Sequence, residues 1–346
     1  MSAQSWLNRI WYEQAKPPVW LLPFEAVFAG ASNLRRWLYA KNLLASKQLA
    51  CPVIVIGNLS VGGTGKTPLV CWLVERLHAL DYKPGVVTRG YGGSNRTPRR
   101  VREADQASVV GDEPLLLARR TRVPVVVGRD RPAAAQLLVQ AGCDVIISDD
   151  GLQHYALARD AEIVVVDAER GFGNGHLLPA GPLREDKDRL ARVDAIVVNG
   201  EPAGARSSGV ARMLTVGMRL RASQAVCLRD STARALTEFA GQAVHAVAGI
   251  GNPERYFNML RAAGLAVIPH ALPDHAAIQP ADIEFGDGLP VLMTEKDAVK
   301  CTALAKPQHW YVPVSAELEA GREGELLGTV TRLIGEYRRS AQGNHG

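Results

Sequence analysis

The sequence of 346 residues predicts an α/β protein: a mostly parallel sheet with helices on both faces, a second, smaller α/β domain and an N-terminal membrane-interface helix. Three observations support this prediction. From residue 52 onward, short β-branched runs alternate with amphipathic stretches. The length favours two domains over one. Aromatic and basic residues gather near the N-terminus, which sets the first segment apart from the rest.

Residues 1–45 form the predicted membrane-associated segment. Four of the six tryptophans and most of the net charge of +5 lie in the first 50 residues. Tryptophan mixed with Lys and Arg is typical of a helix lying among lipid headgroups. Pro23 and Glu25 interrupt the apolar run 19–31, which disfavours a helix that spans the bilayer. The alternative is a helical hairpin packed on the protein's own core.

Composition argues against several other classes of protein. No run of 18 apolar residues and no signal peptide is present, so we expect the bulk of the chain in the cytosol. The five cysteines are scattered without a C-x-x-C pair, which predicts reduced, buried thiols. The eight histidines lack metal-ligand spacing. Magnesium, brought with a nucleotide, is the metal we expect.

The core domain is predicted to cover residues 46–205. Its expected strands are 53–57, 85–88, 123–127, 144–148, 163–167 and 195–199. The clearest helix is 131–141, with Asp130 as N-cap, Pro132 in the first turn and Gly142 at the end.

A change of pattern near residue 200 marks the predicted domain boundary. Residues 201–209 are rich in Gly, Ala and Ser, and alternation over 213–228 predicts a pair of strands within a connecting region, 206–240. A C-terminal α/β domain is expected over 241–338, and residues 339–346 are expected to be disordered. The elements predicted for this C-terminal domain are strands 245–248, 265–269, 290–294 and 310–312 and a helix at 323–338.

The strongest chemical signal is the run VIVIGNLSVGGTGKTP at residues 53–68, a strand that feeds a glycine-rich turn and then a helix. Such a turn, as in P-loop NTPases, points backbone N–H groups at phosphate. Lys66 would reach the β- and γ-phosphates and Thr67 would bind Mg²⁺. The predicted nucleotide-binding residues are Ser60, Val61, Gly62, Gly63, Thr64, Gly65, Lys66 and Thr67. Ser60 stands where the strict pattern has its first glycine.

Acidic residues at strand ends are the next candidates, because phosphoryl transfer needs metal ligands and a group that positions the acceptor. Asp149 and Asp150 follow a buried strand and suit a magnesium-organising role, with a turn residue as the equal alternative. From spacing alone, Asp112 is a helix N-cap and His275 is a structural histidine.

Six runs occur in the order and spacing of the tetraacyldisaccharide 4'-kinase family, which this chain resembles over about residues 45–300. The runs are IGNLSVGGTGKTP (56–68), TRGYGG (88–93), GDEPLL (111–116), DDGLQH (149–154), PAGPLRE (179–185) and TEKDAVK (294–300). The resemblance implies transfer of the γ-phosphate of ATP to the 4'-hydroxyl of a tetraacyl glucosamine disaccharide 1-phosphate. That reaction belongs to lipid A assembly at the cytosolic face of the inner membrane.

The resemblance also implies roles for individual residues. Asp112 would accept or orient the sugar hydroxyl, with His275 paired to it, and Lys66 would complete the catalytic set. The acidic cluster around Mg²⁺ would comprise Glu113, Asp149 and Asp150, together with the hydroxyl of Thr67. Positive charge for phosphate and contacts to the acceptor would come from Arg129 or Arg131, Arg184, Gln153, His154 and Glu185. Residues 273–278 depart from the family because they lack its second histidine and its aromatic residue.

The expected partners are therefore ATP with Mg²⁺, an acylated disaccharide lipid and the inner-leaflet membrane surface. We expect neither nucleic acid nor an obligatory protein partner. A membrane-associated nucleotide switch acting on a protein is the main alternative, and a soluble small-molecule kinase is another. The nearest match to the guanine-binding Asn-Lys-x-Asp pattern is Thr294-Glu-Lys-Asp297, which does not fit it.

Overall fold

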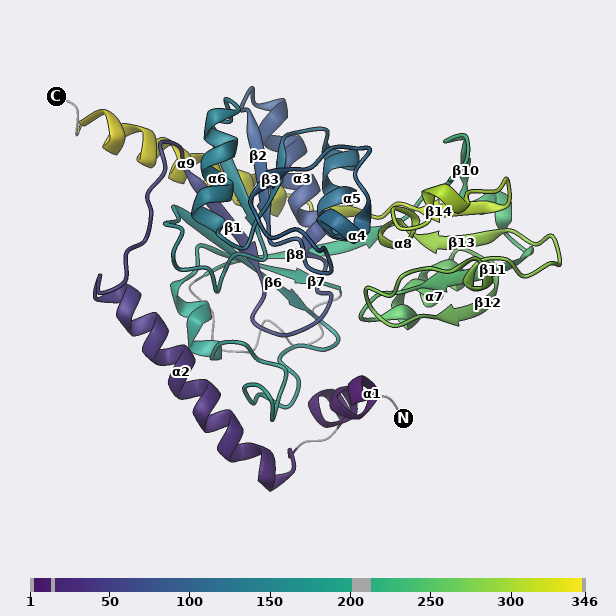
Figure 1. Cartoon of the computed structure of the whole chain (residues 1–346), viewed down its shortest axis with the longest axis horizontal. Helices are drawn as coiled ribbons and strands as arrows, with labels where there is room; N and C mark the ends of the chain where they lie inside the picture. Colours follow the sequence, from purple (N-terminus) through teal and green to yellow (C-terminus); the bar gives the residue numbers. More distant parts are fainter. Residues whose placement is uncertain (1–2, 14–15, 201–212, 344–346) are drawn as a thin grey trace.

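The computed structural model describes residues 3–13, 16–200 and 213–343. Within these residues the strands form two sheets that lie side by side, each accompanied by helices (Figure 1). In the described chain the larger sheet has nine strands, and the smaller has six. We call the part built on the larger sheet the large lobe and the part built on the smaller sheet, residues 224–312, the small lobe.

The large sheet is parallel except at its two edges. In spatial order its strands are β15 (Ser315–Leu318), β8 (Leu214–Arg221), β7 (Ala195–Asn199), β6 (Ala161–Asp167), β1 (Val53–Gly57), β5 (Val145–Asp149), β2 (Pro84–Thr88), β4 (Val125–Val127) and β3 (Arg99–Arg100). Every residue of β1, β2, β5 and β7 is buried, as expected for parallel strands with helices on both faces.

Alternate residues of β1 show how the two faces are covered. Ile54 and Ile56 pack with apolar residues of helices α3 (Lys66–Ala79), α5 (Asp112–Thr121) and α9 (Arg322–Gly343). Val53 and Val55 point the other way and pack with α6 (Arg131–Gln140). The short helix α4 (Ala107–Val110) precedes α5. The sheet therefore separates two apolar cores.

The small lobe is a mixed sheet packed against one main helix. Its strands in spatial order are β10 (Ala233–Ala235), β9 (Gln224–Cys227), β14 (His309–Val312), β13 (Val291–Thr294), β11 (Ala243–Ala248) and β12 (Ala266–Ala271). Helix α7 (Pro253–Ala262) buries Tyr256, Phe257 and Leu260 against this sheet. The short helix α8 (Glu295–Ala298) follows β13 and lies beside α5 of the large lobe.

The predicted strands are confirmed, with boundaries that differ by at most two residues. Asp130 is the N-cap of α6 and accepts a hydrogen bond from the backbone of Ala133, as predicted. The two strands expected over 213–228 are β8 and β9, and one joins each sheet. The predicted loop 201–209 lies outside the described residues.

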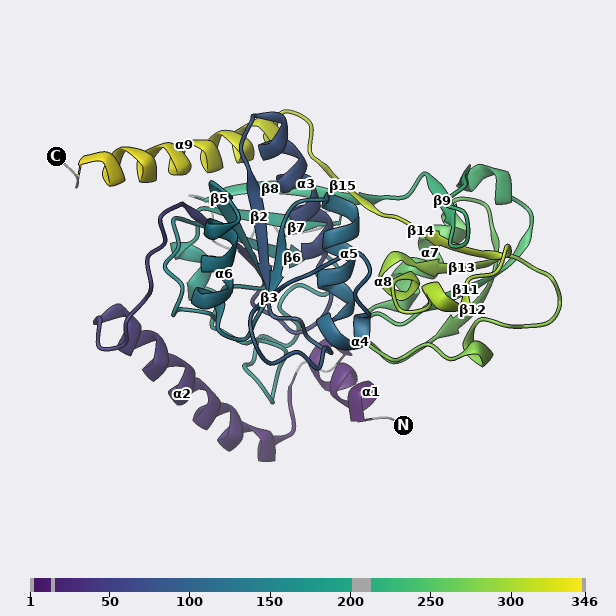
Figure 2. The ribbon, with the colours of Figure 1, turned by 45° about the horizontal axis from the view of Figure 1, so that its top comes forward.

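Two expectations about the C-terminal part are wrong. Strand β15 pairs with β8 and α9 packs on the large sheet, so the chain after residue 312 belongs to the large lobe rather than to a domain 241–338 (Figure 2). The apolar side chains Leu326, Val330 and Ile334 recur at helical spacing and explain this packing. Helix α9 continues to Gly343, so residues 339–343 are helical rather than disordered.

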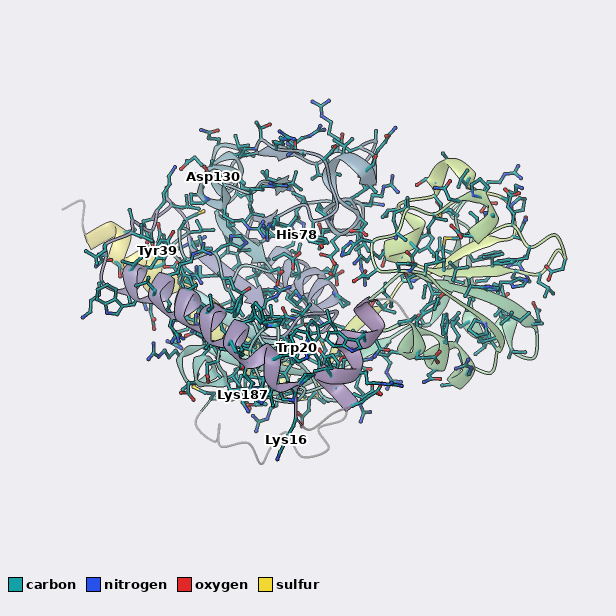
Figure 3. All side chains as sticks on the ribbon, turned by 60° about the horizontal axis from the view of Figure 1, so that its bottom comes forward. Lys16, Trp20, Tyr39, His78, Asp130 and Lys187 are labelled. Atoms are coloured by element: carbon teal, nitrogen blue, oxygen red, sulfur yellow. The ribbon has the colours of Figure 1, made fainter. Side chains whose placement is uncertain are left out.

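The N-terminal segment divides into a packed part and an exposed helix. Helix α1 (Ala3–Asn8) leads into a π-helical turn (Arg9–Glu13), whose Ile10 and Trp11 pack with Leu21 and Ala180. Helix α2 (Leu22–Ala40) follows and has no buried residue. It lies across one side of the large lobe, between Trp20 and Tyr39 (Figure 3). In the described parts of the chain, no helix is long and apolar enough to cross a membrane.

Candidate active site

The phosphate loop joins β1 to α3, and hydrogen bonds from the side chain of Asn58 fix its shape. Gly65 is the N-cap of α3, with φ 94° and Lys66 as the first helical residue. The amide of Asn58 donates to the carbonyls of Ser60, at 2.6 Å, and Gly62, at 3.3 Å, which curls the loop around this side chain. This arrangement leaves the backbone N–H groups at the helix start available to an anion.

The loop opens into a large cavity of about 1620 Å³. Residues 61–67 line this cavity, whereas Ser60 is buried and forms a β-bridge with Leu183. The Nζ of Lys66 lies 3.1 Å from Oδ1 of Asn58 and 3.6 Å from Oδ1 of Asp150. The predicted loop residues therefore lie together, with Ser60 beneath the others.

Asp149 and Asp150 lie next to this loop because β5 pairs with β1. Asp149 is buried, and its Oδ2 accepts a hydrogen bond from Thr88 at 3.3 Å, whereas its Oδ1 has no hydrogen-bond partner. Burial, followed by the charge of Glu113, raises the pKa of Asp149 to about 7. Such an orphaned buried carboxylate oxygen fits a cation.

Asp150 has the opposite electrostatic setting. Its carboxylate accepts two hydrogen bonds from Nη1 of Arg184, at 3.1 and 3.0 Å. Burial raises the pKa of Asp150, but the charges of Lys66 and Arg184 outweigh it and hold the pKa well below its usual range. No three His, Cys, Asp or Glu side chains in the described residues form a metal cage on their own. A magnesium ion here would take the remaining ligands from phosphate and water.

Asp112 and His275 meet across the two lobes. Asp112 begins α5 and is 5% exposed, and His275 follows β12 with φ 61°. The Nδ1 of His275 lies 3.0 Å from Oδ2 of Asp112. Burial raises the pKa of Asp112, but the hydrogen bond with His275 and the charge of Lys296 lower it by more. The net shift of the pKa is therefore downward, and the carboxylate is ionised. Burial lowers the pKa of His275, and the bond with Asp112 reverses that, so the net shift is upward.

Lys296 of α8 was not predicted and lies at the centre of this cluster. Its Nζ is 3.1 Å from Oε1 of Glu113, 3.1 Å from Oδ1 of Asp274 and 3.3 Å from Nε2 of His275. Burial lowers the pKa of Lys296, but the charge of Glu113 and other nearby carboxylates raises it more, so the net shift is upward. Lys296 therefore joins the small lobe to the first turn of α5.

The predicted arginines separate in the structure. Arg129 lines the cavity. Arg131 is 1% exposed and donates from Nη2 to the backbone carbonyl of Asp149 at 2.9 Å, so it lies under the acidic cluster rather than in the cavity. Arg184 lines the cavity and pairs with Asp150. Arg129 and Arg184 are the two of this set that can meet a ligand.

Gln153, His154 and Glu185 gather on one wall. Glu185 accepts hydrogen bonds from Nε2 of Gln153, at 3.1 Å, and from the hydroxyl of Tyr155, at 2.7 Å. Its burial and these bonds suit a supporting role. Burial, followed by the charge of Arg131, lowers the pKa of His154 to about 3, so His154 is neutral near pH 7. His154 can therefore hydrogen-bond a ligand without adding positive charge.

The cavity reaches from the phosphate loop to both the small lobe and the N-terminal segment. Its walls include Phe28 and Arg35 of α2, and Arg170, which follows β6. These residues were not predicted as site residues, because the sequence places them far from the phosphate loop. Lys296 could have been predicted from the sequence, since it lies in the TEKDAVK run that the chain shares with the family.

A family model described as tetraacyldisaccharide-1-P 4'-kinase matches residues 18–331. The chain belongs to this family. A tetraacyldisaccharide 4'-kinase of Nitrosococcus oceani is 48% identical over 326 residues, which are 93% of this chain and 94% of that protein. The corresponding enzyme of Stenotrophomonas maltophilia is 50% identical over 315 residues, 90% of this chain and 92% of that protein.

A solved structure shares the fold over nearly the whole chain. The crystal structure of LpxK from Aquifex aeolicus in complex with ATP matches with a TM-score of 0.78 and 29% identity, covering 90% of this chain and 98% of that one. The predicted family and α/β fold are therefore confirmed.

Proposed function

We propose that this member of the 4'-kinase family transfers the γ-phosphate of ATP to the 4'-hydroxyl of a tetraacyl glucosamine disaccharide 1-phosphate, in lipid A assembly. The observation that carries the proposal is that one cavity is lined by the phosphate loop and by His275, which holds Asp112. Relatives that align along nine-tenths of the chain carry this enzyme name, which disfavours the nucleotide-switch alternative.

The nucleotide is expected at the phosphate loop. Backbone N–H groups of residues 62–66 would bind the β- and γ-phosphates, and Lys66 would leave Asp150 for the phosphate oxygens. The ATP-bound relative supports this assignment. Magnesium would be held by Thr67 and by Asp149, whose Oδ1 is unpartnered, with Asp150 and Glu113 beside it, and would neutralise developing phosphate charge.

Asp112 would orient the 4'-hydroxyl and accept its proton. Its lowered pKa keeps it ionised, so it acts first as a hydrogen-bond acceptor that aims the hydroxyl at the γ-phosphate. His275 holds the carboxylate in place from the other lobe, and Lys296 holds His275. This division makes positioning, rather than strong basicity, the main contribution of Asp112.

The acceptor would enter from the membrane side. Trp20, Phe24 and Val27 are 59%, 59% and 73% exposed, and they give α2 and the turn before it an apolar surface. Insertion of such side chains among lipids is favourable, and the acyl chains hold the acceptor in the bilayer at about 0.8 kcal/mol per CH₂. We place α2 on the cytosolic face of the inner membrane, with Arg35 facing the cavity below.

The acceptor's 1-phosphate would meet Arg129, with Gln153 and His154 as neutral hydrogen-bonding neighbours. Arg184 is assigned to the nucleotide side, because it pairs with Asp150 beside Lys66. The charged contact with Arg129 would distinguish a phosphorylated disaccharide from a neutral glycolipid.

Transfer of ³²P from γ-labelled ATP to a lipid A precursor without the 4'-phosphate tests the proposal. Lys66→Ala should abolish transfer, and Asp112→Asn should lower it by roughly 10²–10⁴-fold while nucleotide binding persists. Lys306→Ala, an exposed lysine of the small lobe, serves as the control. Nucleotide hydrolysis that ignores added glycolipid, with no labelled lipid, would refute the proposal.

A further inference from the structure

The candidate catalytic pair depends on how the two lobes sit against each other. Asp112 belongs to the large lobe and His275 to the small lobe. On the α5 side, Arg120 also bonds Glu295 of α8 at 3.0 Å. In the large sheet, β6 and β7 lie on the other side of β1 from β5, and they end beside α7 of the small lobe. A second set of contacts joins the lobes there.

Arg255 of α7 reaches from the small lobe into the large lobe. Its Nη1 donates to Oδ2 of Asp167 at 2.7 Å, and its Nη2 donates to Oδ1 of Asn199 at 3.0 Å. Asp167 ends β6 and is 2% exposed. Burying a carboxylate to this degree is costly unless a charged or hydrogen-bonding partner accompanies it. Arg255 supplies that partner only while α7 stays against the large lobe.

Arg170 makes the reverse connection, from the large lobe to the small lobe. Asp167 orients it, because Oδ1 of Asp167 accepts from the backbone N–H of Arg170 at 3.1 Å. Its Nη2 donates to the backbone carbonyl of Gly251 at 3.0 Å, and its guanidinium lies 5.1 Å from the ring centre of Tyr12. The same carboxylate, Asp167, therefore organises both arginines.

Both connections adjoin the phosphate loop. Nδ2 of Asn199 donates to the carbonyl of Thr64 at 2.9 Å, so Arg255 acts on the loop through one intermediate side chain. A Cβ on Gly251 would lie 3.3 Å from the backbone nitrogen of Gly63, which shows how closely the small lobe approaches the loop. The hydroxyl of Tyr12 donates to the carbonyl of Val61 at 3.1 Å.

We infer that Arg170 and Arg255 are positioning residues that form a reciprocal clasp: together they hold the small lobe over the phosphate loop and so set His275 against Asp112. The clasp and the Asp112–His275 contact lie on opposite sides of the loop, so loss of the clasp frees the small lobe to rotate about the contacts of α5 and α8. Misplacement by about 1 Å can lower a rate by roughly 10²-fold.

The inference rests on the proposed function for its rate measurements, and a double-mutant cycle tests it. Arg170→Met and Arg255→Met are made in the wild type and in a His275→Ala background, and kcat, the KM for the lipid and the Kd for Mg-ATP are measured. Arg261→Met on the same helix is the control, because its ion pair with Glu254 is exposed. Arg255→Lys keeps a positive charge beside Asp167, so it distinguishes the loss of positioning from a failure to fold.

We expect kcat to fall by roughly 10–100-fold in the wild-type background, with KM and Kd changed by less than about 3-fold. In the His275→Ala background the same substitutions should change kcat by less than about 3-fold, because the group they position is already gone. Arg255→Lys should recover part of the loss. Equal losses in both backgrounds, or a loss confined to Mg-ATP affinity, would overturn the clasp.

Small-angle scattering separates a failed clasp from a failed function. The Arg170→Met/Arg255→Met double variant should show a larger radius of gyration than the wild type and Arg261→Met. An unchanged radius overturns the inference even if lipid phosphorylation is confirmed. A wild type that does not phosphorylate the lipid, combined with an enlarged double variant, refutes the proposed function and leaves the clasp supported.

Discussion

Substitution of Gly65 by alanine is expected to disable the phosphate loop without unfolding the protein. Gly65 has φ 94°, which L-residues adopt at a cost of about 1–2 kcal/mol. A Cβ at this position would lie 2.5 Å from Nδ2 of Asn199 and 3.1 Å from Cε of Met218. The Asn199 side chain would have to move, because the first of these separations is shorter than any real contact of a Cβ.

The expected magnitude follows from the bonds that Asn199 makes. Its displacement breaks the neutral bond to the carbonyl of Thr64, about 0.5–1.5 kcal/mol, and the charged bond from Arg255, about 1.5–3 kcal/mol. With the backbone strain, the loop loses about 3–6 kcal/mol of its preference for the binding conformation. If half of this free energy opposes nucleotide binding, about 1.5–3 kcal/mol, the affinity for Mg-ATP falls by about 10- to 150-fold.

Calorimetric titration with Mg-ATP and thermal unfolding measure the two parts separately. Gly142→Ala is the matched control, because Gly142 has φ 84° and open space around the Cβ position, far along the chain from the loop. This control should lower stability by about 1 kcal/mol and leave the Kd unchanged. A Gly65→Ala protein that binds Mg-ATP within about 3-fold of wild type would refute the reasoning.

Two further predictions concern the membrane and pH. Serine at Trp20, Phe24 and Val27 should weaken flotation with anionic vesicles and lower lipid phosphorylation, with Mg-ATP affinity retained. Leu80→Ser, at an exposed position after α3, is the control, and equal binding of both proteins to vesicles would contradict the assignment. His309 is buried, and burial lowers its pKa, so its stabilising contribution is present above about pH 6.5 and is lost as pH falls. The free energies of unfolding of wild type and His309→Asn, measured in urea, should converge as pH falls below this value. Free energies that stay parallel over the same pH range would contradict the prediction.

The elements that the sequence predicts well are those whose surroundings are uniform. Strands buried on both faces read as continuous β-branched runs, and β1 and β7 match their predicted boundaries. The glycine-rich turn and Lys66 are also local, because a strand, a turn and a helix start are contiguous in the chain. Asp149 follows from the same logic, since strand ends gather at one edge of a parallel sheet.

The elements that escaped prediction depend on contacts between distant segments. Spacing alone made Asp112 a helix cap and His275 a structural residue, and the pair was predicted only from resemblance, because 163 positions separate them. Helix α9 carries an ordinary amphipathic pattern that does not state which sheet it covers. Arg131 looked like a phosphate ligand, but its position at the start of α6 turns it under β5, where it bonds Asp149.

The loop of residues 176–184 connects helix α2 to the phosphate loop. Glu25 of α2 accepts a hydrogen bond from the backbone N–H of Leu177 at 2.7 Å. At the other end of the loop, the backbone N–H of Val61 donates to the carbonyl of Pro182 at 2.8 Å. The loop is closed on itself by a bond from Leu178 to Leu183 at 2.9 Å.

Few side chains attach α2 to the rest of the described chain, so its link to the loop 176–184 matters for the proposed reaction. The helix buries none of its own residues. Its contacts with the rest of the described chain include the bond that Glu25 accepts from Leu177, the contact of Glu25 with Nδ1 of His176 at 2.9 Å, and the ring contact between Tyr39 and Tyr155. If α2 rests on the bilayer as proposed, the backbone bonds of the loop 176–184 would couple its depth to the position of the phosphate loop. An acceptor whose acyl chains stay in the bilayer would present its hydroxyl near the same surface, so this coupling would help to bring the γ-phosphate to the hydroxyl.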